Sequence, residues 1–149
     1  MSIREQIIIA IVGQLKNITV ANGYNFDFGL NINRANYLYD ESELTAITVW
    51  PGEERINNKY AKQTRSMDVR LECFYLLEDE TETNDAIANK IMADVQKNMG
   101  ANIPALKSIT NSVIEVDLEP VYPDDSNVLS VRIDYQVEYE TVKGDPYLQ

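Results

Sequence analysis

The stretch Val128–Thr141, with the sequence VLSVRIDYQVEYET, decides the fold of this chain. From Leu129 to Glu140, every second side chain is aliphatic or aromatic and those between are polar or charged. Because successive side chains of a strand point to opposite faces, this period predicts a long β-strand with one face in the core. The expected core face carries Leu129, Val131, Ile133, Tyr135, Val137 and Tyr139, and the outer face carries Ser130, Arg132, Asp134, Gln136, Glu138 and Glu140.

Further strands are predicted on the N-terminal side of this stretch. One runs over residues 112–120, joined to the last strand by turn residues 123–127; a longer one runs over residues 67–77. In the first, Ile114, Val116 and Leu118 are expected to face the core, opposite Val113, Glu115, Asp117 and Glu119.

Two short strands are predicted earlier in the chain. Residues 26–32 alternate between apolar and polar or glycine, and a polar connection over residues 33–43 follows. Residues 46–50 form a second apolar run, which Pro51-Gly52 is expected to stop. The six charged residues of the next segment, Glu53–Ser66, leave it too little apolar surface to order itself by burial, so a mobile loop is predicted there.

Two amphipathic helices complete the pattern. Residues 2–18 repeat apolar side chains every three or four positions after a capping box of Ser2 and Glu5, and residues 82–99 repeat them after an acidic lead. The order of elements predicts an α+β fold, an antiparallel-dominated sheet of about four to five strands with two helices packed on one face. We expect one domain over residues 1–142 and a flexible C-terminal tail over residues 143–149.

Composition argues against several functions. The chain has 149 residues, no histidine and one cysteine, which excludes nucleophilic sites that need a histidine base and leaves zinc only carboxylate ligands. We interpret Cys73 as a small core residue. A net charge of −11 disfavours direct binding of DNA or RNA. The apolar run Ile7–Val12 is much shorter than the roughly 20 residues that span a membrane, so we expect no membrane partner and a protein that stays where it is made.

Carboxylates are the remaining candidates for chemistry. Acids line one face of each of the two last predicted strands, which leaves a divalent-cation site or a metal-dependent hydrolase as an alternative. We prefer a solvated strand face that discourages wrong edge pairing. No catalytic, metal-binding or cofactor-binding residue is therefore assigned, and no enzyme is expected.

The segment around Trp50 is the candidate interface. An aromatic residue at the mouth of a charged loop is typical of a surface that becomes ordered on assembly. The candidate residues for contact with other subunits are Trp50, Glu53, Glu54, Arg55, Lys59, Lys62 and Arg65.

Two segments resemble the tail terminator (tail completion) proteins of long-tailed bacteriophages. They are Ile18–Tyr24 (ITVANGY), after the first helix, and Glu43–Glu54 (ELTAITVWPGEE), where a short apolar strand ends in an aromatic residue and a Gly-Glu turn. The later order of long strand, acidic turn, helix and two strands is also similar. The resemblance covers most of the chain as a pattern of order and spacing.

The resemblance implies a structural subunit of the virion, assembled in the host cytoplasm. Such a subunit forms a ring, a hexamer in this family, on the head-proximal end of the tail tube. The ring ends polymerisation of the tail tube protein and offers a surface to the head-completion or connector protein. A head-completion or neck protein and a tail-tube subunit are the alternatives.

DNA would pass through the lumen of that ring without specific binding. Six copies at −11 each would carry a formal charge of about −66, which keeps a polyanion from adhering. The candidate lumen-facing acids are Glu115, Asp117, Glu119, Asp134 and Glu138.

Overall fold

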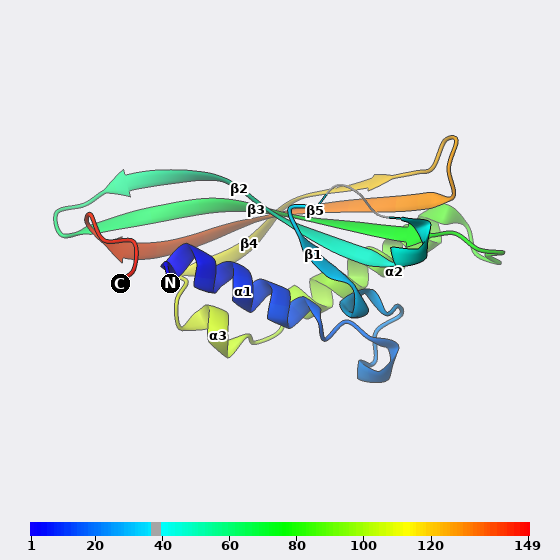
Figure 1. Cartoon of the computed structure of the whole chain (residues 1–149), viewed down its shortest axis with the longest axis horizontal. Coiled ribbons are helices and arrows are strands. Elements are labelled where there is room, and N and C mark those ends of the chain that lie inside the picture. Colours follow the sequence, from blue (N-terminus) through cyan, green and yellow to red (C-terminus); the bar gives the residue numbers. More distant parts are fainter. Residues whose placement is uncertain (37–39) are drawn as a thin grey trace.

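The computed structural model describes residues 1–36 and 40–149, and over these it has an α+β fold with one sheet (Figure 1). The helices and strands are α1 (Ile3–Leu15), β1 (Ile32–Arg34), β2 (Ala46–Asn58), β3 (Lys62–Leu76), α2 (Asn84–Met99), α3 (Pro104–Lys107), β4 (Ser112–Val121) and β5 (Val128–Val142). Short 3-10 helices occupy Val20–Asn22, Phe28–Leu30 and Glu41–Glu43.

The sheet has the strand order β1-β2-β3-β5-β4. The pairs β2–β3, β3–β5 and β4–β5 are antiparallel, while the short β1 runs parallel to β2, so the sheet is mixed rather than purely antiparallel. The predicted α+β class and strand number are confirmed. Figure 1 shows that the helices lie on one face of the sheet; the other face is called the open face below.

The stretch Val128–Thr141 forms the predicted long strand, as part of β5. All six apolar side chains expected in the core are buried, from Leu129 to Tyr139. Cys73 is also buried, on the same face of β3 as Val69 and Leu71, which confirms its interpretation as a core residue. Burial of this apolar face against the helices is the main stabilising term of the fold.

The two predicted helices are confirmed, with shorter bounds. The Ser2 hydroxyl accepts a hydrogen bond from the backbone N–H of Glu5 at 3.2 Å and so caps α1. The helices are joined by two reciprocal side-chain bonds: Asn98 Nδ2 donates to the carbonyl of Gln14 at 3.0 Å, and Gln14 Nε2 donates to the carbonyl of Asn98 at 3.1 Å. The short helix α3 was not predicted.

The predicted mobile loop over residues 53–66 is wrong, because this segment forms a β-hairpin. β2 does not stop at Pro51-Gly52; a register shift between Pro51 and Glu54 carries it on to Asn58, and β3 begins at Lys62 rather than at residue 67. The first half of β3 lies between β2 and β5, so its backbone groups are paired on both sides. These hydrogen bonds and cross-strand ion pairs order a segment that has little apolar surface to bury.

The strand predicted over residues 26–32 is also wrong. Residues 28–30 form a 3-10 helix, and the rings of Phe26 and Phe28 both pack against the core, 5.8 Å apart between centroids. The backbone at Gly29 lies close to the backbone of Lys16. Only glycine fits there, because a Cβ atom would lie 2.4 Å from the carbonyl oxygen of Lys16. Part of the polar connection predicted over residues 33–43 lies outside the described residues.

The predicted alternation in β4 fails at a bulge. The register against β5 shifts between Glu115 and Asp117. As a result Leu118 packs against the core as expected, but Ile114 and Val116 do not, and each is about half exposed.

The residues expected to form a flexible tail make several hydrogen bonds. The N–H of Val142 donates to the carbonyl of Leu148 at 2.8 Å, and the N–H of Ile3 donates to the carbonyl of Pro146 at 3.0 Å. The C-terminal residues therefore lie beside the start of α1.

Candidate interaction surface

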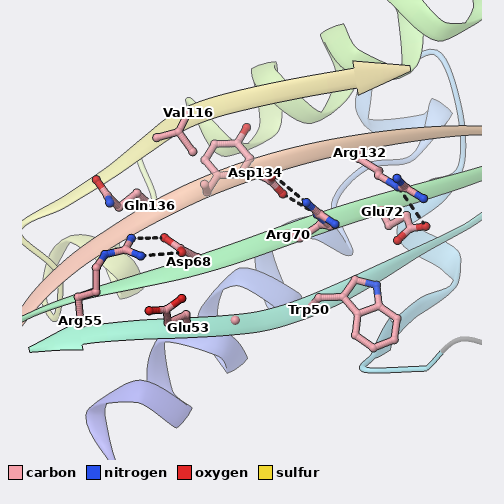
Figure 2. A pocket seen from close by; sticks show the side chains of 12 residues that line it. Trp50, Glu53, Arg55, Asp68, Arg70, Glu72, Val116, Arg132, Asp134 and Gln136 are labelled. Carbon is pink, nitrogen blue, oxygen red and sulfur yellow. Dashed lines mark hydrogen bonds and ion pairs between the residues drawn. The ribbon is translucent and has the colours of Figure 1, made fainter. Parts of the chain in front are cut away.

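The open face of the sheet carries a series of arginine–carboxylate pairs across its strands (Figure 2). Arg55 of β2 binds Asp68 of β3 with both terminal nitrogens, at 2.7 and 3.2 Å. Arg70 of β3 also forms a bidentate pair, with Asp134 of β5: its Nε and Nη2 donate to the two carboxylate oxygens at 2.8 and 3.1 Å. Both pairs follow from the strand register, which places side chains of opposite charge on neighbouring strands.

A third arginine is held more loosely. Arg132 Nε lies 3.7 Å from a carboxylate oxygen of Glu72, and Arg132 Nη1 lies 3.8 Å from one of Glu119. Both distances are ion-pair contacts that exceed hydrogen-bond length. The Arg132–Glu72 pair therefore keeps hydrogen-bonding capacity that the pairs of Arg55 and Arg70 have used.

These pairs surround a hollow of about 810 Å³, called here the open-face hollow. Its wall includes Trp50 at one end and Val116 at the β4 side, which the β4 bulge turns to this face (Figure 2). At Gly52 the backbones of β2 and β3 come close, since a Cβ atom there would lie 3.1 Å from the carbonyl oxygen of Asp68. The hollow is lined by Trp50, Gly52, Glu53, Arg55, Asp68, Arg70, Glu72, Val116, Arg132, Asp134, Tyr135 and Gln136.

The hydrogen bonds to their carboxylate partners favour the charged forms of Arg55 and Arg70. The bond to Asp68 is the main cause that raises the pKa of Arg55 above its ordinary value, and the bond to Asp134 does the same for the pKa of Arg70. The hollow thus carries charged side chains of alternating sign, which suit a polar partner.

The seven predicted interface residues divide into three groups. Trp50, Glu53 and Arg55 lie together on the open face and line the hollow. Lys59 and Lys62 flank the tip of the β2–β3 hairpin, where both pair with Glu140, at 3.7 and 3.3 Å. Glu54 and Arg65 lie on the helix face instead.

Glu54 is the centre of a polar cluster between α1 and the sheet. Its carboxylate accepts hydrogen bonds from Arg65 Nη1 at 2.8 Å, from Arg4 Nη1 at 3.2 Å and from the hydroxyl of Tyr139. The register shift after Pro51 turns Glu54 inward, and its side chain is only 14% exposed. Glu54 and Arg65 therefore do not belong to the exposed interface that the sequence suggested.

The cluster stabilises the ionised form of Glu54. Burial acts to raise the pKa of Glu54, but the bonds from Tyr139 and Arg65 and the nearby charge of Arg4 outweigh it, so this pKa lies below its ordinary value. Burial and the bond to Glu54 raise the pKa of Tyr139.

The five predicted lumen acids do not form one group. Asp117, Glu119, Asp134 and Glu138 lie on the open face, as their register positions in β4 and β5 require. Glu115 lies on the helix side of the β4 bulge, where its carboxylate accepts a hydrogen bond from Gln96 Nε2 at 2.8 Å. The assumption of unbroken alternation in β4 caused this error.

The sequence interpretation missed the cross-strand partners of its candidate residues: Asp68 beside Arg55 and Arg70 beside Asp134. Arg70 and Asp134 are 64 positions apart, and no local pattern pairs them. Alternating arginines and acids on the polar faces of two long strands were the available signal, but their pairing depends on register.

We also searched residues 1–36 and 40–149 for metal-binding groups, membrane-spanning helices and reactive side chains outside the open-face hollow. No group of three or more histidine, cysteine or acidic side chains there could hold a metal ion, and no helix there is long and apolar enough to cross a membrane. Burial raises the pKa of the Cys73 thiol, which keeps it protonated and unreactive.

In comparisons with known proteins, the chain matches no protein-family model and no curated protein sequence.

Proposed function

We propose that this protein is a structural assembly subunit of the tail terminator type. It caps the head-proximal end of a phage tail tube as a ring, a hexamer in the family it resembles. The observation that carries the proposal is the combination of a charged, open sheet face with a hairpin that extends past the helices (Figure 1). A hollowed charged face and a projecting arm are complementary shapes, which suit contacts between repeated subunits.

The two long sides of the sheet also support an assembly role. β4 is one edge. On the other side β1 pairs with residues 47–49 of β2, and among the described residues no strand pairs with the outer side of residues 54–58, which form the other edge. Both edges carry a register shift, a feature that prevents uncontrolled strand addition. A terminator needs this property, because it must join a defined number of copies and then stop.

The mechanism is steric and interfacial. The ring occupies the surface of the last tube ring on which the next one would assemble, and its opposite surface receives the head-completion or connector protein. No covalent step is required.

Electron microscopy tests the proposal. The purified chain is added to tubes assembled from the tail tube protein of the same phage, and further tube protein is then supplied. We expect a ring-shaped cap at one tube end and no growth from that end. Continued growth from both ends would refute the terminator function, and filaments of the purified chain alone would identify a tube subunit instead.

A further inference from the structure

We propose that the tip of the β2–β3 hairpin of one copy docks into the open-face hollow of a second copy. This contact rests on the ring assembly proposed above and assigns it an interface. The tip (residues 59–62) is the inserted part, and Tyr60 is its anchor.

Tyr60 is unusual in its exposure. Its relative exposure is 101%, the highest of the large apolar or aromatic side chains on the described surface. It stands at the end of a hairpin that projects beyond the helical layer (Figure 1). Tyrosine contributes a large apolar ring and a hydroxyl to interfaces at a low cost in side-chain entropy, so an anchor of this kind is favourable at a docking tip.

The hollow contains a pair of groups that match the tyrosine hydroxyl. Glu72 is only 14% exposed, and its contact to Arg132 is an ion pair of 3.7 Å. Arg132 Nε is buried and has no hydrogen-bond partner within the described ranges 1–36 and 40–149. A hydroxyl group both donates and accepts, so one entering tyrosine can donate to Glu72 and accept from a terminal nitrogen of Arg132, whose side chain is 39% exposed.

The charges of the tip and the hollow are complementary. Four carboxylates and three guanidinium groups line the hollow, and Glu119 adds another carboxylate beside Arg132. At the tip, Lys59 and Lys62 share the single carboxylate of Glu140 and stay more than half exposed. The lysines therefore have capacity to bind the surplus acids, such as Glu53, at the rim of the hollow.

The inserted tip belongs to a second copy, because a chain cannot insert its own. The tip and the hollow are parts of the same strands, β2 and β3, and the sheet would have to fold back on itself. A contact between two different surfaces of identical subunits is head-to-tail, and it closes into a ring when the rotation between neighbours permits.

Cysteine cross-linking tests the contact directly. Ala61→Cys protein, which keeps Tyr60, is mixed with Val116→Cys protein under mild oxidation; Ala61 is exposed at the tip, Val116 lies at the wall of the hollow and is half exposed, and the native Cys73 is buried. We expect this mixed disulfide to form at least about tenfold faster than the disulfide between Leu30→Cys and Val116→Cys, because docking raises the effective concentration of the thiols; Leu30 is an exposed residue outside the tip. Equal rates for the two mixtures would overturn the proposed contact.

A second measurement isolates the hydroxyl. Tyr60→Phe keeps the ring and removes the group that bridges Glu72 and Arg132, so cross-linking of Val116→Cys to Ala61→Cys should slow about tenfold when the tip also carries Tyr60→Phe. Tyr147→Phe, at another exposed tyrosine, should leave the rate unchanged. An unchanged rate with Tyr60→Phe would contradict the bridging role.

The tube-capping experiment and the cross-linking experiment test different claims, so either claim can be refuted while the other stands. Capped tubes without specific cross-linking would leave the terminator function standing and refute the contact. Specific cross-linking with uncapped, growing tubes would support the contact and refute the terminator function.

Discussion

Glu54 is a nearly buried carboxylate that joins helix α1 to three strands. Arg4 reaches it from α1, Arg65 from β3 and Tyr139 from β5. Ion pairs of this kind are costly to break from one side, because the remaining partners keep buried charges without compensation. At the residue scale, Glu54 is therefore the polar group on which the packing of α1 against the hairpin depends most.

We predict that Glu54→Gln lowers the free energy of unfolding at pH 7 by about 2–4 kcal/mol. The pKa of Glu54 is below its ordinary value of 4.5, so its contribution is present above that pH and is lost as the pH falls through the lowered pKa. Urea unfolding at several pH values measures both effects, and the variant and the wild type should converge in acid. Glu53→Gln is the matched control: Glu53 is exposed on the opposite face, and its replacement should change stability by less than about 0.5 kcal/mol. Equal effects at the two positions would contradict the assigned burial.

At the scale of elements, the β2–β3 hairpin is the feature that distinguishes this fold from a compact helix-on-sheet layer. Its outer half has few apolar side chains, and it is ordered by the continuous ladder from β2 through β3 to β5. Residues 63–66 of β3 are in the middle of that ladder. These hydrogen bonds lie within one chain, so the tip that we propose to dock is held in place without a partner.

Hydrogen exchange of the isolated protein checks this order. We predict slow amide exchange over residues 63–66, because their N–H groups are paired between two strands, and fast exchange over the exposed turn 123–127. The measurement is exchange followed by mass spectrometry of peptic fragments. Exchange over residues 63–66 as fast as over the turn would show that the arm is a loop in solution.

At the scale of the whole molecule, the loops after β3 and after β4 lie at the end of the sheet opposite the hairpin tip (Figure 1) and are rich in acidic residues. The loops after β3 and after β4 meet there, joined by a hydrogen bond of 2.7 Å from Leu77 N to the carbonyl of Asn127. They carry Glu78, Asp79, Glu80, Glu82, Asp124 and Asp125. Burial and the acids of this cluster, with the bond to Glu80 foremost among them, raise the pKa of Tyr75 to about 12.

If the chain forms the ring proposed above, the acids expected to repel DNA are those of these two loops rather than those of the open face. On the open face, Asp134 is paired with Arg70 and Glu119 with Arg132, so their negative charge is compensated. We predict that Asp124→Lys with Asp125→Lys slows DNA ejection from phage particles, since added positive charge in the lumen retains a polyanion. Asp117→Lys with Glu138→Lys serves as the comparison, and ejection is timed by a DNA-binding dye. A larger effect of the second pair would place the open face at the lumen, against the head-to-tail contact.

The local sequence determined the secondary structure of the segments with the longest unbroken apolar period. The alternation from Leu129 to Glu140 is sufficient for β5, and the capped apolar repeat after Ser2 is sufficient for α1, because each pattern is satisfied by one face of one element. Only the tertiary structure decided where the polar residues go. The continuation of β2 beyond Pro51, the inward turn of Glu54 and the displacement of Glu115 all follow from register shifts between strands distant in sequence. Register depends on long-range backbone pairing, which a local pattern of apolar residues does not specify.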